Sequence, residues 1–207
     1  MDQGKDDLVD LSKIFAGQKN MIAGHSTEYL ESFQHTVLFW DSENASQYLS
    51  LDNEYFDARV ATSTTSEHSF KTVFAAEPFE QGDRYYFEIK FLKGCNFKIG
   101  VGSNRRQTDV AFCYSPDGFG YYSAGQLRNG SKTTGAKYGE CFRGTKDQDV
   151  VGVYVDLIDG KIFFSKNGII YRTAFQGPHI LANDMYAACC CLTKDESFEL
   201  LLPQPED

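Results

Sequence analysis

The stretch DVVGVYVDLIDGKIFFSKNGIIYRTAF, which spans Asp149–Phe175, decides the fold of this chain. Its apolar residues alternate with others over Val151–Leu157, which is the period of a β-strand with one buried face. The dipeptides Asp159-Gly160 and Asn167-Gly168 can each supply the positive φ angles of a tight turn. This stretch therefore predicts two consecutive hairpins, and hence an antiparallel meander.

The rest of the chain from residue 37 shows the same pattern of short apolar runs and turns. The expected strands are VLFW (37–40), QYLSL (47–51), SFKTVFA (69–75), Arg84–Leu92, Lys98–Gly102, Phe119–Ser123, a short one at Tyr138, Met185–Leu192 and Ser197–Leu202. Closely spaced short strands are typical of a β-sandwich. We therefore predict an all-β fold, a two-sheet antiparallel β-sandwich over residues 37–207, with its functional residues on loops.

Residues 1–36 differ from the rest and form an N-terminal extension in this prediction. Apolar side chains recur in it at helical spacing, at Leu8, Leu11, Ile14 and Phe15. This spacing indicates a short amphipathic helix, capped by Asp6 or Asp7, that docks on the sheets. A flexible tail is the alternative.

Composition and charge exclude several classes of partner. The 207 residues fit one all-β domain. With 20 basic and 29 acidic residues, the net charge of −9 opposes nucleic-acid binding. We interpret five basic residues as solvated loop charges, with a local basic patch as the alternative: Arg105, Arg106, Arg128, Lys132 and Lys137. No apolar run reaches the roughly 18 residues of a membrane span, and the N-terminus has no signal peptide. We expect a soluble cytoplasmic protein, with the nucleus as the alternative.

No motif in the sequence requires catalysis. Gly125–Thr133 is similar to a phosphate-binding loop but places Ser131 where that motif needs Lys. The four histidines lie outside any nucleophile motif and are typical of surface loops. The six cysteines lack paired metal-binding spacing, and the adjacent Cys189–Cys191 are expected to be reduced thiols in a strand. We therefore expect no catalytic residue, no metal and no cofactor.

Five short motifs follow one another along the chain. They are Tyr86–Ile89, Ile99–Gly102, Phe119–Tyr121, Tyr138-Gly139 and the hairpins that begin at Val151. In this order they resemble the SPRY domain family, over about residues 38–202, and are most similar to its Ran-binding-protein and SOCS-box types. One departure is Gln148, where the family usually has glycine, and we expect it to alter only a turn.

The resemblance implies a shallow groove, made by loops at one edge of the sandwich, that holds short peptide segments of partner proteins. Three segments would supply the contacts, which are Arg59, Val60, Thr62, Val110, Phe112, Tyr114, Leu192, Thr193 and Lys194. Aromatic walls would bury an apolar anchor, while the Arg59 guanidinium would hold a carboxylate or carbonyl group. Packing in the core is the alternative for Phe112 and Tyr114, and a solvent-exposed ion pair is the alternative for Arg59.

The resemblance therefore implies a monomeric, non-catalytic protein-interaction module that acts as an adaptor or scaffold. Substrate recognition for a ubiquitin ligase is part of this expectation. The alternatives are an RNA-associated accessory domain and a β-sandwich that binds carbohydrate or another small ligand. The single tryptophan, Trp40, gives the carbohydrate alternative little support.

Overall fold

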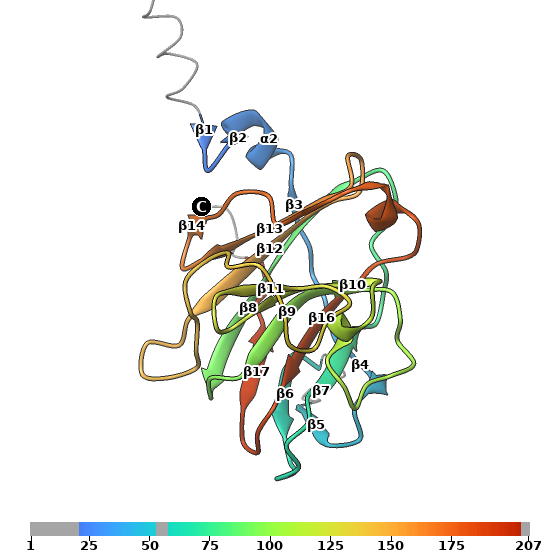
Figure 1. Ribbon diagram of the computed structural model, residues 1–207, viewed down its shortest axis with the longest axis vertical. Coiled ribbons are helices and arrows are strands. Elements are labelled where there is room, and N and C mark those ends of the chain that lie inside the picture. The colour runs from blue at the N-terminus through green and yellow to red at the C-terminus, as the bar shows by residue number, and fades with distance from the viewer. Residues whose placement is uncertain (1–20, 53–57, 204–207) are drawn as a thin grey trace, which may run out of the picture.

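Two β-sheets stack face to face in the computed structural model, which describes residues 21–52 and 58–203 (Figure 1). The pairings within both sheets are antiparallel, apart from one short strand that runs parallel to its neighbour. The two-sheet antiparallel β-sandwich that the sequence predicts is therefore confirmed.

The six-stranded sheet has the spatial order β11-β10-β9-β16-β7-β4 in the described part of the chain. Its strands are β4 (Trp40–Ala45), β7 (Lys71–Ala75), β9 (Phe97–Gly102), β10 (Gly118–Tyr122), β11 (Gln126–Arg128) and β16 (Tyr186–Cys191). The cysteine triplet thus lies in a central strand, as expected, and its thiols are free and buried.

The nine-stranded sheet has the order β14-β13-β12-β8-β17-β6-β5 among the described residues, with β15 beside β13 and β3 beside β8. Its strands are β3 (Gln34–His35), β5 (Leu49–Asp52), β6 (Val60–Ser63), β8 (Arg84–Lys93), β12 (Val150–Asp156), β13 (Lys161–Lys166), β14 (Ile169–Ile170), β15 (Phe175–Gln176) and β17 (Ser197–Leu200). The strand β3 is the one that runs parallel to its neighbour. A separate hairpin joins β1 (Met21–Ile22) to β2 (His25–Ser26).

The described residues contain three short helices, α2 (Thr27–Glu31), η2 (Phe112–Tyr114) and η3 (Pro178–Leu181). The helix α2 begins after Ser26, whose hydroxyl accepts a hydrogen bond from the backbone N–H of Tyr29 at 3.2 Å. None of the three has the length and hydropathy needed to cross a membrane. The amphipathic helix predicted around Leu8 to Phe15 lies outside the described residues.

The core lies between the two sheets and takes one alternating face from each strand. Val153 of β12 stands opposite Phe164 of β13 and Phe87 of β8, and all three side chains are fully buried. Ile99 of β9 and Cys189 of β16 belong to the same core from the opposite sheet. The alternation in the sequence therefore identifies the inward face correctly.

The two hairpin turns differ from each other. Asn167 and Gly168 have φ angles of +50° and +79°, as a two-residue turn between β13 and β14 requires. The turn between β12 and β13 is longer and spans Leu157–Gly160. A two-residue turn at Asp159-Gly160 is therefore wrong, because the carboxylate of Asp156 binds the next backbone N–H groups and shapes a wider turn.

Two other strands differ from their predicted positions. The strand expected from Val37 begins at Trp40, because the chain first pairs with β8 and then crosses to the other sheet. Tyr138 lies in no named strand, and its neighbour Lys137 makes a single bridge to Gln126. The short strand of this segment is β11, which pairs with β10.

Gln148 lies in a conformation that favours glycine. Its φ angle is +47°, in the left-handed region where a side chain crowds the backbone. The side-chain amide of Gln148 donates a hydrogen bond to the carbonyl oxygen of Leu92 at 3.3 Å. This contact helps to hold a turn that glycine would adopt without strain.

The N-terminal segment, residues 21–36, lies against the outer face of the nine-stranded sheet, at the top of Figure 1. The ring of His25 stacks on Phe163 with 4.0 Å between ring centroids, and Phe33 packs edge-on against Phe163 and Tyr154. His25 is buried, and burial lowers its pKa. The expectation that the histidines lie in surface loops is therefore wrong for His25, because the aromatic outer face must be covered.

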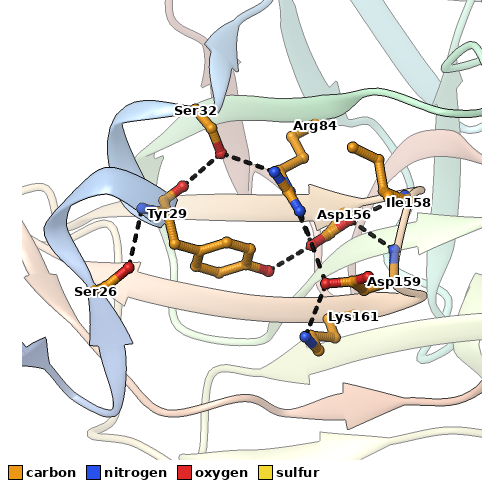
Figure 2. Close-up of polar contacts among 8 residues, drawn as sticks. All are labelled: Ser26, Tyr29, Ser32, Arg84, Asp156, Ile158, Asp159 and Lys161. Carbon is orange, nitrogen blue, oxygen red and sulfur yellow. Dashed lines mark hydrogen bonds and ion pairs between the residues drawn. The ribbon is translucent and has the colours of Figure 1, made fainter.

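Asp156 anchors this segment to the sheet (Figure 2). Its fully buried carboxylate accepts hydrogen bonds from the Tyr29 hydroxyl at 2.7 Å and from Arg84 Nε at 3.0 Å. Burial raises the pKa of Asp156, but hydrogen bonds from the turn, Tyr29 and Arg84 outweigh burial, so the pKa lies below its usual value. The carboxylate is therefore charged at neutral pH and holds α2 against the sheet.

Core packing gives the first prediction. Phe164→Ala should lower the free energy of unfolding by about 3 to 5 kcal/mol, because it leaves a cavity between the sheets. The control Ile169→Ala, at a side chain that is 65% exposed, should change it by less than about 0.5 kcal/mol. Urea denaturation measures both, and similar values for the two variants would show that the strand faces are assigned wrongly.

The anchor at Asp156 gives the second prediction. Asp156→Asn should lower the free energy of unfolding by about 2 to 3 kcal/mol, because Arg84 then loses its buried counter-ion. Because the folded pKa is lowered, acid should remove this contribution as the pH falls below about 4. The control Asp159→Asn, at an exposed position, should cost less than about 1 kcal/mol. Hydrogen exchange that is unchanged at residues 25–35 in Asp156→Asn would contradict the anchoring role.

Candidate functional site

A second, smaller cluster of apolar side chains lies on the outer face of the six-stranded sheet. Its buried members, which we call the outer cluster, are Phe70, Phe74, Ala111, Phe112, Cys113, Ala188 and Cys190. They come from the strands of the sheet, from Phe70 just before β7, and from the loop between β9 and β10, residues 103–117, which we call the covering loop. The covering loop therefore closes this face of the sheet with apolar contacts.

Thr72 of β7 holds the covering loop to the sheet. Its backbone N–H donates to the carbonyl oxygen of Thr108 at 2.7 Å, and its hydroxyl donates to that of Val110 at 2.6 Å. The same hydroxyl accepts a hydrogen bond from the backbone N–H of Phe112 at 3.1 Å. Ser46 adds a hydrogen bond to the Asp109 carboxylate at 2.5 Å, so the loop is fixed at several points.

Glycine in β10 lets the covering loop come close to the sheet. A Cβ atom at Gly118 would lie 2.3 Å from the carbonyl oxygen of Phe112, and one at Gly120 would lie 2.9 Å from Cys113 Sγ. Both distances are shorter than real contacts allow. The Phe119–Tyr121 motif therefore has a physical role, since its glycine makes room for the loop while its aromatic rings face the core.

The covering loop forms a pocket with a cavity of about 330 Å³, which we call the Tyr114 pocket. Its lining consists of Asn104, Gln107, Val110, Ala111, Phe112, Tyr114, Ser115, Pro116 and Lys132. Three of the predicted contacts, Val110, Phe112 and Tyr114, thus lie at one site. Phe112 is only 4% exposed and packs in the outer cluster, whereas Val110 and Tyr114 are partly exposed.

Lys98 lies buried beneath this pocket among aromatic rings. Its Nζ lies 3.0 Å from the ring centroid of Phe70, 4.6 Å from that of Tyr114 and 4.9 Å from that of Tyr122. Lys98 Nζ also donates a hydrogen bond to the Tyr114 hydroxyl at 3.1 Å. Burial lowers the pKa of Lys98 to about 8, and the rings replace part of the lost hydration.

Two further cations continue this arrangement. The guanidinium of Arg128 lies 5.2 Å from the Tyr122 ring centroid, and Lys132 Nζ lies 5.8 Å from that of Tyr114. Within residues 21–52 and 58–203, neither these two cations nor Lys98 forms an ion pair with a carboxylate. The interpretation of Arg128 as a solvated charge is wrong, because it is buried against the sheet.

The loop between β16 and β17, residues 192–196, which we call the late loop, borders the same face. Leu192 packs against the outer cluster, and its carbonyl oxygen accepts a hydrogen bond from the buried Lys71 Nζ at 3.0 Å. The Glu196 carboxylate accepts hydrogen bonds from the backbone N–H groups of Leu192 and Thr193 at 2.9 and 2.8 Å. The backbone at Leu192 and Thr193 is therefore rigid, while the side chain of Lys194 is exposed.

The first predicted segment lies on the other sheet. Val60 and Thr62 belong to β6, and Arg59 precedes it and forms an ion pair with Glu199 at 3.5 Å. Only the end of β6 approaches the late loop, where the backbone of Ser63 bonds to Glu196. The structure therefore brings Val110, Tyr114 and Leu192 to one face and leaves Arg59 on the neighbouring sheet.

Sequence reasoning missed Lys98, whose signal was present but weak. In the run NFKIGVG, Lys98 takes the outward position between the buried residues Phe97 and Ile99. A lysine in such a strand usually reaches solvent, and nothing local shows that residues 107–114 will cover it. The described residues also contain no group of three or more His, Cys, Asp or Glu side chains that could hold a metal ion.

A comparison with protein families identifies the family of this chain. A family model described as the SPRY domain matches residues 84–205, which is more than half of the chain. The chain belongs to the SPRY family. SPRY domains are generally non-catalytic modules that bind other proteins. The covering loop and the late loop lie within the matched residues of this SPRY domain, whereas Arg59–Thr62 precede them.

Solved structures show the same fold. The SPRY domain of human HERC1 has a TM-score of 0.63 at 18% identity, covering 81% of this chain and 99% of that one. A structure described as a human SPRY domain has a TM-score of 0.62 at 17% identity, covering 77% and 98%. The TRIM65 PSpry domain has a TM-score of 0.62 at 15% identity, covering 82% and 94%. Membership in the Ran-binding-protein or SOCS-box type stays a prediction.

The environment of Lys98 gives the third prediction. With its pKa near 8 in the folded protein, Lys98 releases a proton that the unfolded chain retains up to about pH 10, so its contribution to stability should rise over that range. The buried thiols have raised pKa values and act in the opposite direction. Lys98→Met keeps the thiols and removes the lysine, so the comparison isolates the lysine.

The measurement is the free energy of unfolding, in reducing buffer, from pH 8 to about pH 10. Wild type should gain stability relative to Lys98→Met as the pH rises. The control Lys146→Met, at an exposed side chain, should follow wild type. A pH-independent difference between wild type and Lys98→Met would show that Lys98 is not held in a desolvated site.

Proposed function

We propose that this SPRY domain recognises a short peptide segment of a partner protein through the Tyr114 pocket and the adjoining late loop. The single observation that carries the proposal is the pocket itself, a cavity of about 330 Å³ with apolar and polar walls on a loop that the sheet holds rigid. A preorganised loop loses little entropy on binding, so a few contacts can give useful affinity.

The proposal includes a non-catalytic adaptor role, in which the bound protein is presented to another factor such as a ubiquitin ligase. The rest of the molecule supports a role as a rigid frame, since segments of the chain itself pack on both outer faces of the sandwich. Ubiquitin ligases among proteins captured with the wild-type chain would support this part of the proposal.

The alternatives receive less support from the described residues. Trp40, the single tryptophan, is buried in the core and packs edge-on against Phe198, so it offers no platform for a sugar ring. Lys98 and Arg128 are buried and therefore badly placed to contact the phosphates of RNA. A protein segment is the partner that best fits a small pocket with mixed walls.

The fourth prediction tests the site with two matched variants. Val110 and Val60 are both partly exposed, but Val110 lines the pocket and Val60 lies on the other sheet. Val110→Arg should fill the pocket and reduce captured partner by about tenfold or more, which corresponds to about 1.4 kcal/mol. Val60→Arg should leave capture unchanged.

Affinity capture from lysate followed by mass spectrometry gives the readout, and peptides from a digest of the captured partner should rebind to wild type. Melting temperatures confirm that both variants fold. Equal capture by both variants would reject the pocket. Loss with Val60→Arg alone would instead support the segment Arg59–Thr62 as the binding site.

A further inference from the structure

The hydroxyl proton of Tyr114 has no hydrogen-bond acceptor among the described residues. Lys98 Nζ donates to the Tyr114 oxygen at 3.1 Å, so this oxygen is an acceptor in that contact and its own proton must point elsewhere. Among residues 21–52 and 58–203, no group accepts that proton. Burial raises the pKa of Tyr114 to about 12, so the hydroxyl keeps its proton at neutral pH and can act as a donor.

The charged side chain in the lining of the pocket is a cation. Lys132 lines the pocket and is exposed, while Lys98 lies beneath it. No Asp or Glu among the described residues lines the pocket, although Asp109, whose carboxylate accepts a hydrogen bond from Ser46, adjoins the lining residue Val110. Asp117 adjoins the lining residue Pro116 but is not part of the lining.

This local positive charge stands out because the chain as a whole carries a net charge of −9. Acidic ligands are repelled by most of the surface, so a pocket with cations and no carboxylate is selective for one negative group at one place. Arg128 is buried and not part of the lining, and its guanidinium donates hydrogen bonds to the Leu127 carbonyl oxygen and the Gln126 side chain. The exposed cation of the pocket is therefore Lys132.

We propose that the Tyr114 pocket receives the carboxylate of an aspartate or glutamate side chain in the partner segment. One carboxylate oxygen accepts the proton of the Tyr114 hydroxyl, and the ammonium group of Lys132 pairs with the other. Val110 and Pro116 contact the apolar part of the same segment. This inference rests on the proposed function, since it names the chemistry of the peptide that the pocket binds.

A peptide carboxylate fits better than a neutral side chain for a physical reason. A carboxylate has two oxygens and accepts hydrogen bonds only, so it satisfies a phenol proton and an ammonium group together. An amide side chain would place an N–H group against one of these donors. A free anion would satisfy the same donors but would not use the apolar walls that Val110, Phe112 and Pro116 supply.

The test selects peptides from a random 12-residue phage-display library on three immobilised proteins. These are wild type, Lys132→Glu and the control Lys146→Glu, which makes the same charge change at an exposed position outside the pocket. Wild type and Lys146→Glu should enrich Asp and Glu at one fixed position. Lys132→Glu should lose that enrichment or replace it with Lys and Arg.

The best wild-type peptide is then synthesised with its acidic residue intact, changed to the matching amide, or changed to phosphoserine. The amide should bind wild type about tenfold more weakly or worse, while Tyr114→Phe should weaken binding of the acidic peptide and reduce the penalty for the amide. Inorganic phosphate should compete only weakly. Strong competition by phosphate, or tighter binding of the phosphoserine peptide, would overturn the carboxylate assignment in favour of a phosphoryl group.

The outcomes separate the two proposals. If no peptide is selected on wild type, and Val110→Arg also captures partners normally, the proposed function fails. If peptides are selected but show no acidic position, or if Lys132→Glu selects the same peptides as Lys146→Glu, the carboxylate assignment fails while peptide recognition stands.

Discussion

Each sheet of a sandwich has two faces, and only one of them can face the core. The outer face of the six-stranded sheet carries Phe70, Phe74 and Cys190, which must also be removed from water. The covering loop does this by folding back over the sheet, with Thr72 as its main attachment. The candidate site is a consequence of that need, since the loop that buries the apolar face also forms the pocket.

The nine-stranded sheet meets the same constraint with a different segment. Its outer face presents Phe163 and Tyr154, and residues 21–36 cover them with their own rings. Here a buried carboxylate, Asp156, provides the attachment. On the other sheet one of the buried charges is Lys98, which is surrounded by rings and has no counter-ion among the described residues. The charge of Asp156 is balanced by Arg84. The charge of Lys98 has no carboxylate partner among the described residues and can still attract a negative group.

The fold follows from local patterns, while the site depends on contacts between distant segments. Alternation at Val151–Leu157 and the Asn167-Gly168 turn gave the hairpins and their inward faces, because strand period and turn chemistry act over a few residues. Arg59 precedes a strand of one sheet and Tyr114 lies in the loop that covers the other, so their grouping in one groove stays a prediction. The role of Lys98 could not be predicted, because its cover comes from Tyr114, 16 positions further along the chain.

The family-model match begins at residue 84, yet the sandwich begins earlier in the chain. On one side β16 pairs with β7, and on one side β17 pairs with β6; both of these partner strands precede residue 84. A fragment cut at residue 84 would leave β16 and β17 with open edges, and one of those edges carries Cys189–Cys191. Unpaired apolar edges invite pairing between molecules, so such a fragment should aggregate. The cooperative folding unit is thus longer than the segment that the family model matches.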